Sequence, residues 1–180
     1  MKWITGLGMA AGVVLVMGMV SQAVHGQDKT VVKPLRVGVY DSRCVAVACA
    51  PTEWWNTQVR EKMKEMEAAK AAGDEQKIKE LEQWGGQHQQ KAHRMAFGTA
   101  SVKELLTSVA KELPAIAQVA GVDMIVSKWQ IDYQVEGAEY VDVTDAVVAL
   151  YKPSEKTLKT VESVKKTKPI SEEEILKIKD

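Results

Sequence analysis

The chain has 180 residues and equal numbers of basic and acidic side chains, 24 of each, so its formal net charge is zero. This length is typical of one domain with an appendage. The charge balance excludes the strongly basic proteins that bind nucleic acid, because no net positive field attracts phosphates.

Residues 1–26 have the features of an export signal. An apolar, glycine-rich run at 4–20 follows the positive charge of Lys2. Two cleavage sites follow, after Ala23 and after Gly26, and the first has the small residues that signal peptidase requires. The alternative is a retained membrane anchor, but the run is short for a spanning helix. We therefore expect a cleaved, periplasmic protein.

A polar linker at 27–34 leads to a predicted strand at 35–40, along which apolar side chains alternate with others. Residues 44–50 are small and apolar, and their pattern does not distinguish strand from helix. The spacing of Cys44 and Cys49 in regular structure exceeds the ~7 Å between Cα atoms that a disulfide allows. We expect both to be buried as small apolar residues, with a bridge to another chain as the alternative.

Residues 52–96 carry the strongest helical signal, because they are rich in Glu, Lys, Gln, Ala and Met. Gly73 and Asp74 suit a helix end and the start of the next helix. The pattern predicts two helices, 52–72 and 75–95, of about 21 residues and roughly 32 Å each. They would form an antiparallel hairpin arm with its tip at Gly73, the alternative tip being Gly85.

Both predicted arm helices have an apolar stripe, which indicates either a coiled-coil seam or a surface that binds a partner. Trp54 lies beside Trp55 and cannot share its helical face. Methionine side chains adapt to different partners. We expect the client-binding residues to be Trp54, Trp55, Val59, Met63, Met66, Ile78, Leu81 and Trp84.

The predicted body continues with a helix from a capping box at Ser101 to Gly121, kinked at Pro114. Strands are predicted at 122–126 and at 130–135, the second with one apolar face. The Asp-Val-Thr sequence at 142–144 is expected to cap a last body helix, 145–151.

Residues 152–180 form a tail whose first helix is predicted around Val161 and whose second is capped by Ser171 and Glu174. The tail either packs on the body or trails in solvent. The predicted fold is α+β, with a small β-rich body of about three strands plus helices and a protruding antiparallel helical hairpin. A body of about 70 residues with open strand edges is expected to form oligomers.

Motifs for catalysis or metal binding are absent from the sequence, including phosphate-binding glycine loops, nucleophile turns and zinc-protease signatures. His88 and His93 are five residues apart and do not share a helical face. The aspartates near predicted strand ends are interpreted as caps; they are Asp41, Asp123, Asp132 and Asp142. We expect no enzyme activity, no catalytic or metal site, no cofactor and no small-molecule substrate.

Several short motifs together resemble the Skp/OmpH family of periplasmic chaperones. They are the strand that ends in Asp41, the sequence Ala-Gly-Val-Asp-Met-Ile-Val at 120–126, the Ile-Asp-Tyr sequence at 131–133, and Val-Asp-Val-Thr-Asp-Ala-Val-Val at 141–148. The resemblance covers 35–151. It implies a homotrimer whose helical arms enclose a cavity and hold unfolded outer-membrane proteins without ATP.

The chain departs from that family in three ways that concern its clients. The arm is short and has breaks at Gly73 and Gly98, the chain is not basic, and the tail from Ser154 has no counterpart. The first hypothesis is an ATP-independent chaperone-like protein. The alternative is a cell-envelope scaffold whose coiled coil docks one fixed partner. Exposed apolar side chains on the arm favour the chaperone, and a sealed seam favours the scaffold.

Overall fold

The computed structural model describes residues 34–175, apart from the side chains of Glu172 and Ile175. These residues all belong to one compact unit. The predicted signal segment, most of the linker and the last five residues lie outside the described part, so export and cleavage stay predictions. In the part that the structure describes, no helix is both long enough and apolar enough to cross a membrane.

A three-stranded parallel sheet in the order β2-β1-β3 organises the body, which places the chain in the α+β class as predicted. The strands are β1 (Val37–Tyr40), β2 (Met124–Ser127) and β3 (Val141–Asp142). Gly38 in the central strand pairs with Ile125 on one side and Val141 on the other. A Cβ atom at Gly38 would lie 3.1 Å from Val122, so the glycine permits this close approach.

The strand predicted at 130–135 is wrong. Residues Lys128–Gln130 form the 3-10 helix η2, and the chain then runs without regular structure to β3. Tyr133 and Val135 are 82% and 61% exposed, because no described element covers the face on which they alternate. Alternation predicts a strand only where a neighbour packs on the apolar face. The third strand of the sheet is instead β3, at 141–142, so the predicted number of about three strands is confirmed but the position of the third is wrong.

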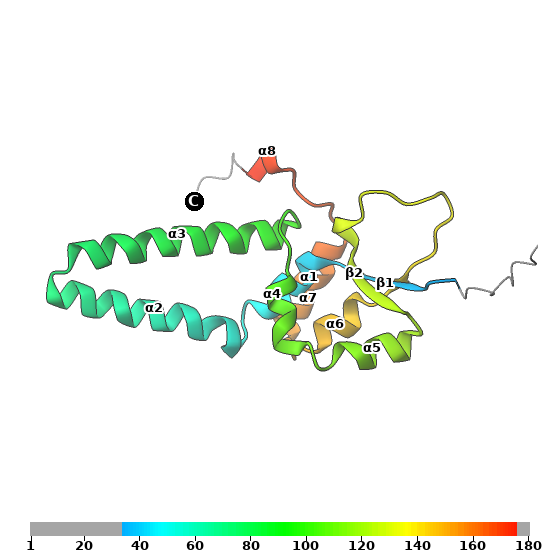
Figure 1. Cartoon of the computed structure of the whole chain (residues 1–180), viewed down its shortest axis with the longest axis horizontal. Coiled ribbons are helices and arrows are strands. Elements are labelled where there is room, and N and C mark those ends of the chain that lie inside the picture. Colours follow the sequence, from blue (N-terminus) through cyan, green and yellow to red (C-terminus); the bar gives the residue numbers. More distant parts are fainter. Residues whose placement is uncertain (1–33, 176–180) are drawn as a thin grey trace, which may run out of the picture. The chain divides into compact units, whose positions relative to one another are not determined.

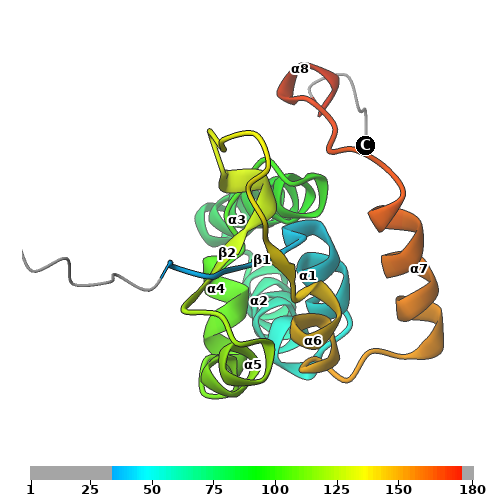
Figure 2. The same ribbon diagram turned by 90° about the vertical axis from the view of Figure 1, so that its right-hand side faces the viewer.

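The small apolar run that the sequence left unassigned is helix α1 (Ser42–Cys49), the centre of the core. All of its residues except Val47 are buried. Figure 2 shows α1 beside α6 (Thr144–Ala149) and α7 (Glu155–Lys165), and it contacts both. Cys44 and Cys49 are free and buried, which confirms their predicted role as apolar residues.

The long helix predicted from Ser101 to Gly121 is divided into three pieces: α4 (Lys103–Leu106), η1 (Thr107–Val109) and α5 (Leu113–Ala120). Pro114 stands in the first turn of α5, where its missing N–H costs nothing, and does not kink a continuous helix. The predicted capping box does not form. Ser101 accepts from the Lys103 amide, while the Glu104 carboxylate pairs with Lys91.

Two predicted helix starts are present, one at the end of the body and one in the tail, and each has a side-chain hydrogen bond to a backbone amide. The Asp142 carboxylate accepts from the Thr144 amide at 2.8 Å, and α6 begins there. The Ser171 hydroxyl and the Glu174 carboxylate each accept from the other's backbone N–H at the start of α8 (Glu172–Ile175). Helix α7 packs on α1 and does not trail in solvent.

Helices α2 (Glu53–Ala72) and α3 (Glu75–Phe97) lie side by side (Figure 1), and we refer to them as the helix pair. Gly73 ends α2 with a φ of 67°, and the Asp74 carboxylate accepts from the Lys77 amide to begin α3. The helix break is therefore at Gly73, as predicted. The alternative break at Gly85 is excluded, because Gly85 lies inside α3.

Candidate functional site

A groove between α2 and α3 brings most of the predicted client-binding residues together. Its volume is about 410 Å³. The lining residues are Val59, Lys62, Met63, Met66, Glu67, Lys70, Leu81, Glu82, Trp84 and Gly85. The five apolar side chains among them were all predicted from the two helical stripes.

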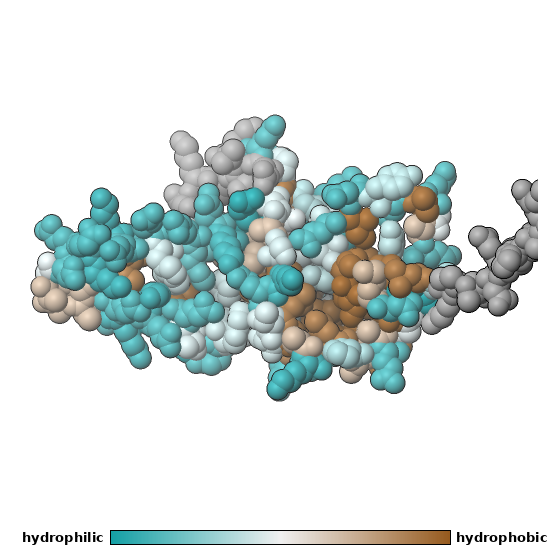
Figure 3. Space-filling view, viewed as in Figure 1, coloured by the Kyte–Doolittle hydropathy of each residue, from teal (hydrophilic) through white to brown (hydrophobic). Residues whose placement is uncertain are grey.

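The groove is open because the two stripes do not seal against each other. The only buried residue of α2 is Ala69, and α3 buries only Leu81 and Met95. Met63 keeps 59% of its surface exposed. Figure 3 shows the helix pair as mainly hydrophilic, with hydrophobic colour visible between the helices. The pair therefore presents apolar surface in a groove with a polar exterior.

Glycines keep part of the groove empty. A Cβ atom at Gly85 or at Gly86 would have no neighbour within 4 Å, and Gly85 lines the groove. Glycine inside a helix costs about 0.5–1 kcal/mol relative to alanine. Both positions thus lack a side chain although the fold has room for one.

Three stacked rings close the groove on the side of the body. His88 lies between Trp84 and Trp55, with centroid distances of 4.8 and 4.7 Å. The His88 Nε2 atom is buried without a hydrogen-bond partner. Burial lowers the pKa of His88, and the positive charge of Lys91 lowers it further against the opposing effect of Glu104. A neutral imidazole can therefore stack between the two indoles.

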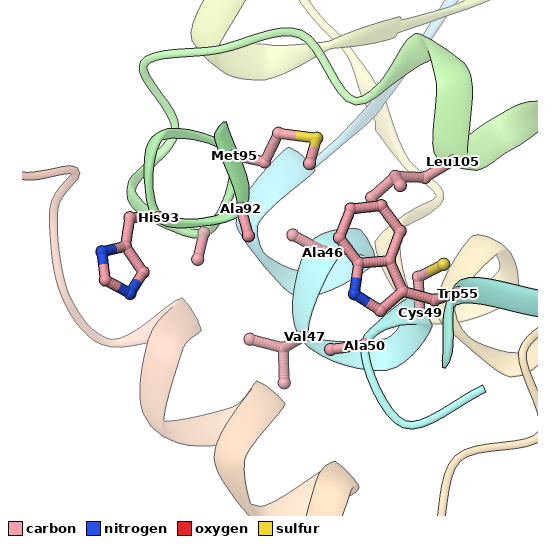
Figure 4. A pocket seen from close by; sticks show the side chains of 10 residues that line it. Ala46, Val47, Cys49, Ala50, Trp55, Ala92, His93, Met95 and Leu105 are labelled. Carbon is pink, nitrogen blue, oxygen red and sulfur yellow. The ribbon is translucent and has the colours of Figure 1, made fainter. Parts of the chain in front are cut away.

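A second hollow, the base pocket, lies where the helix pair joins the body (Figure 4). Its volume is about 190 Å³. The lining side chains come from α1, the turn after it, α2, α3 and α4, and they are Ala46, Val47, Cys49, Ala50, Trp55, Ala92, His93, Met95, Ala96 and Leu105. Sequence reasoning missed this pocket because its walls meet only in the folded chain.

The remaining predicted residues are not in the groove. Trp55 lines the base pocket. Trp54 is 38% exposed, and its ring centroid lies 6.4 Å from that of Trp55. Ile78 is half-buried in α3. Trp54 and Ile78 line neither hollow.

Asp41, at the end of the central strand, is the centre of a buried ion cluster. Its carboxylate accepts from Arg43 Nη2 at 2.8 Å and from Trp129 Nε1 at 2.7 Å, and Lys128 Nζ lies 3.0 Å away. Burial acts to raise the pKa of Asp41, but these hydrogen bonds and the charge of Arg43 prevail and lower it to about 2. The carboxylate thus stays ionised in the core.

Arg43 links this cluster to the tail. Its Nη2 atom donates to the backbone carbonyls of Val164 and Thr167, at 3.1 and 2.9 Å, at the end of α7. Arg43 is only 2% exposed. The sequence predicted Asp41 as a helix cap, and it does accept from the Arg43 amide at the start of α1. The contacts of Asp41 with Lys128 and Trp129 were not predicted, because both residues are distant from Asp41 in sequence.

Comparison of the chain with protein-family models, with curated proteins and with solved structures gives no match. The resemblance to the Skp/OmpH family therefore stays a prediction. Within residues 34–175, no group of three or more His, Cys, Asp or Glu side chains is placed to hold a metal ion.

Proposed function

We propose that the protein is an ATP-independent, chaperone-like protein of the periplasm. In this proposal the helix pair is a protruding antiparallel hairpin arm that holds unfolded envelope or outer-membrane proteins. The observation that carries it is the open groove, in which five apolar residues from two helices face one hollow. A scaffold with a sealed coiled coil would bury these side chains, whereas Met63 is largely exposed.

The chemistry of the groove suits many unrelated clients. Met63 and Met66 have flexible, polarisable side chains that can repack around different apolar groups. Burial of one large apolar side chain contributes about 1.5–3 kcal/mol before the cost of ordering the client. Holding therefore requires several weak contacts along the groove, without a covalent step.

The rim of the groove carries no net charge, because Lys62 and Lys70 are balanced by Glu67 and Glu82. Long-range attraction of a charged client is therefore weak. We expect client capture to depend little on salt concentration. A steep loss of capture with added salt would instead indicate recognition by charge.

We also propose that the body forms a homo-oligomer, with a homotrimer as the expected form. Strands β2 and β3 are the open edges of the sheet, and open edges pair with other chains. Beside β3, α5 and α6 line an apolar hollow of about 740 Å³ at which Val119 is 90% exposed. Light scattering should give a mass above that of the monomer at micromolar concentration, and a folded monomer there would contradict this proposal.

The decisive experiment on holding replaces both Met63 and Met66 by alanine. Suppression of aggregation of an unfolded β-barrel client should fall at least threefold, because two adaptable groove contacts are lost. The thermal midpoint should change little, because Met63 is exposed and Met66 is not fully buried.

Leu158→Ala is the matched control, because Leu158 is also exposed, at 43%, and lies in α7 outside the groove. It should retain full activity. Equal activity in the double variant and the wild type would contradict holding in the groove. A large loss of stability in the double variant would favour the scaffold.

A further inference from the structure

We propose that the base pocket binds one phenyl ring, presented by a phenylalanine side chain of an extended polypeptide. The floor of the pocket is buried and is formed by Ala46, Cys49, Met95 and Leu105. Its rim is accessible, since Ala50 is exposed and Trp55 is half-buried. A side chain can therefore enter from solvent and reach an apolar floor (Figure 4).

Small residues on two helices keep the pocket empty. Ala46 in α1 and Ala50, the residue that follows α1, are four residues apart, and Ala92 and Ala96 are four apart in α3. This spacing places each pair on one face of its segment. All four side chains line the same hollow, and none is long enough to fill it.

The size and chemistry of the pocket select an aromatic ring. An apolar cavity of about 150 Å³ stays dry and binds benzene, and the base pocket is of similar volume at about 190 Å³. Trp55 supplies an aromatic wall for a second ring. The Met95 thioether lies on the floor, and thioether sulfur makes favourable contacts with rings.

The position of the pocket favours a polypeptide as the source of the ring, and this part of the inference rests on the proposed function. Trp55 lines the pocket, Trp84 lines the groove, and His88 is stacked between them. The Trp55 and Trp84 rings are therefore at most two stacking distances apart, a length that about three residues of extended chain span. One client segment can thus lie in the groove and place a phenylalanine in the base pocket.

The test measures binding of toluene and of N-acetyl-phenylalaninamide to the full chain by NMR titration. Both probes should bind, and N-acetyl-leucinamide should bind at least threefold more weakly. Ala92→Leu should reduce binding of both ring probes at least tenfold, because the new side chain fills the pocket. Ala68→Leu is the matched control, because Ala68 is exposed on α2 and does not line the pocket.

Ala50→Leu tests the same point from the exposed rim if Ala92→Leu disturbs the fold, and it too should weaken binding. Absence of toluene binding to the wild type would overturn the site. Binding of toluene without binding of N-acetyl-phenylalaninamide would overturn the polypeptide source. The double variant Leu176→Asp with Ile178→Asp tests whether the chain's own C-terminal residues occupy the pocket. Tighter probe binding to this variant would identify them as the occupant and would overturn the proposal that a client supplies the ring.

Failure of this inference is distinguishable from failure of the proposed function. Met63→Ala with Met66→Ala leaves the base pocket intact, so toluene should still bind to that variant. Loss of client holding in the methionine variant supports the groove, whatever the probes show. Loss of toluene binding in the same variant would contradict the separation of the two hollows.

Discussion

The body and the helix pair use apolar residues in opposite ways. In the body, Val45, Val147 and Val161, which come from α1, α6 and α7, are at most 1% exposed and belong to one core cluster. In the helix pair, the apolar side chains of the groove remain partly open, and Leu81 is the exception at 5%. The body therefore depends on packing between distant segments, whereas the pair depends on local helix formation and keeps apolar surface for a partner.

The two regions also differ in their charged groups. The body buries Asp41 and Arg43 together, which specifies one arrangement of the strand end and the tail. The helix pair carries exposed ion pairs such as Arg60 with Glu53, which contribute little. A change of one charge should therefore have a large effect in the body and a small effect in the pair.

The largest expected effect is that of Asp41→Asn. It leaves Arg43 buried without its anionic partner, and removing one partner of a buried pair costs about 3–5 kcal/mol. Urea unfolding measures the loss. Glu53→Gln, the matched change in the helix pair, should change the stability little, because solvent screens this exposed ion pair. Similar losses of unfolding free energy in the two variants would contradict the expected difference between the body and the helix pair.

A pair of leucine truncations gives the next largest effect. Leu105→Ala should cost about 2–5 kcal/mol, because Leu105 is 2% exposed in the packed core. Leu81→Ala should cost less, because Leu81 packs within the helix pair and does not belong to the core cluster that contains Leu105. Chemical denaturation of both variants checks the order, and a larger loss for Leu81 would contradict it.

Acid should act on the body through Asp41. The folded pKa of about 2 lies below the ordinary value of 3.8, so folding favours the ionised carboxylate. This contribution is complete above about pH 4 and is lost as the pH falls towards 2. The free energy of unfolding, measured between pH 5 and 2, should fall for the wild type. It should fall less for Asp41→Asn, because that variant lacks the carboxylate.

The smallest expected effect is a gain in stability at Gly85. Gly85→Ala should stabilise the helix pair by about 0.5–1 kcal/mol, because the added methyl group meets no neighbour and alanine favours the helix. Gly86→Ala should give a similar gain. Amide hydrogen exchange in α3 measures the change, and a loss of protection there would contradict the open space at these glycines.

Features decided by neighbouring residues were predictable from the sequence. The break at Gly73 follows from its left-handed conformation and the Asp74 cap, and the groove residues follow from helical spacing. Features that need distant contacts were not predictable. Asp41 and Trp129 meet across 88 positions of the chain, and alternation at 130–135 gave no sign that its apolar face would lack a neighbour.

The link from Arg43 to the carbonyl of Thr167 has a consequence for synthesis of the chain. It joins residues 124 positions apart, and the central strand pairs only with β2 and β3, which the ribosome makes much later. Helices α2 and α3 are neighbours in the sequence, so their contacts with each other can form on a partial chain. The body must wait for Val164 and Thr167, because contacts of long sequence separation form slowly and require both contacting segments.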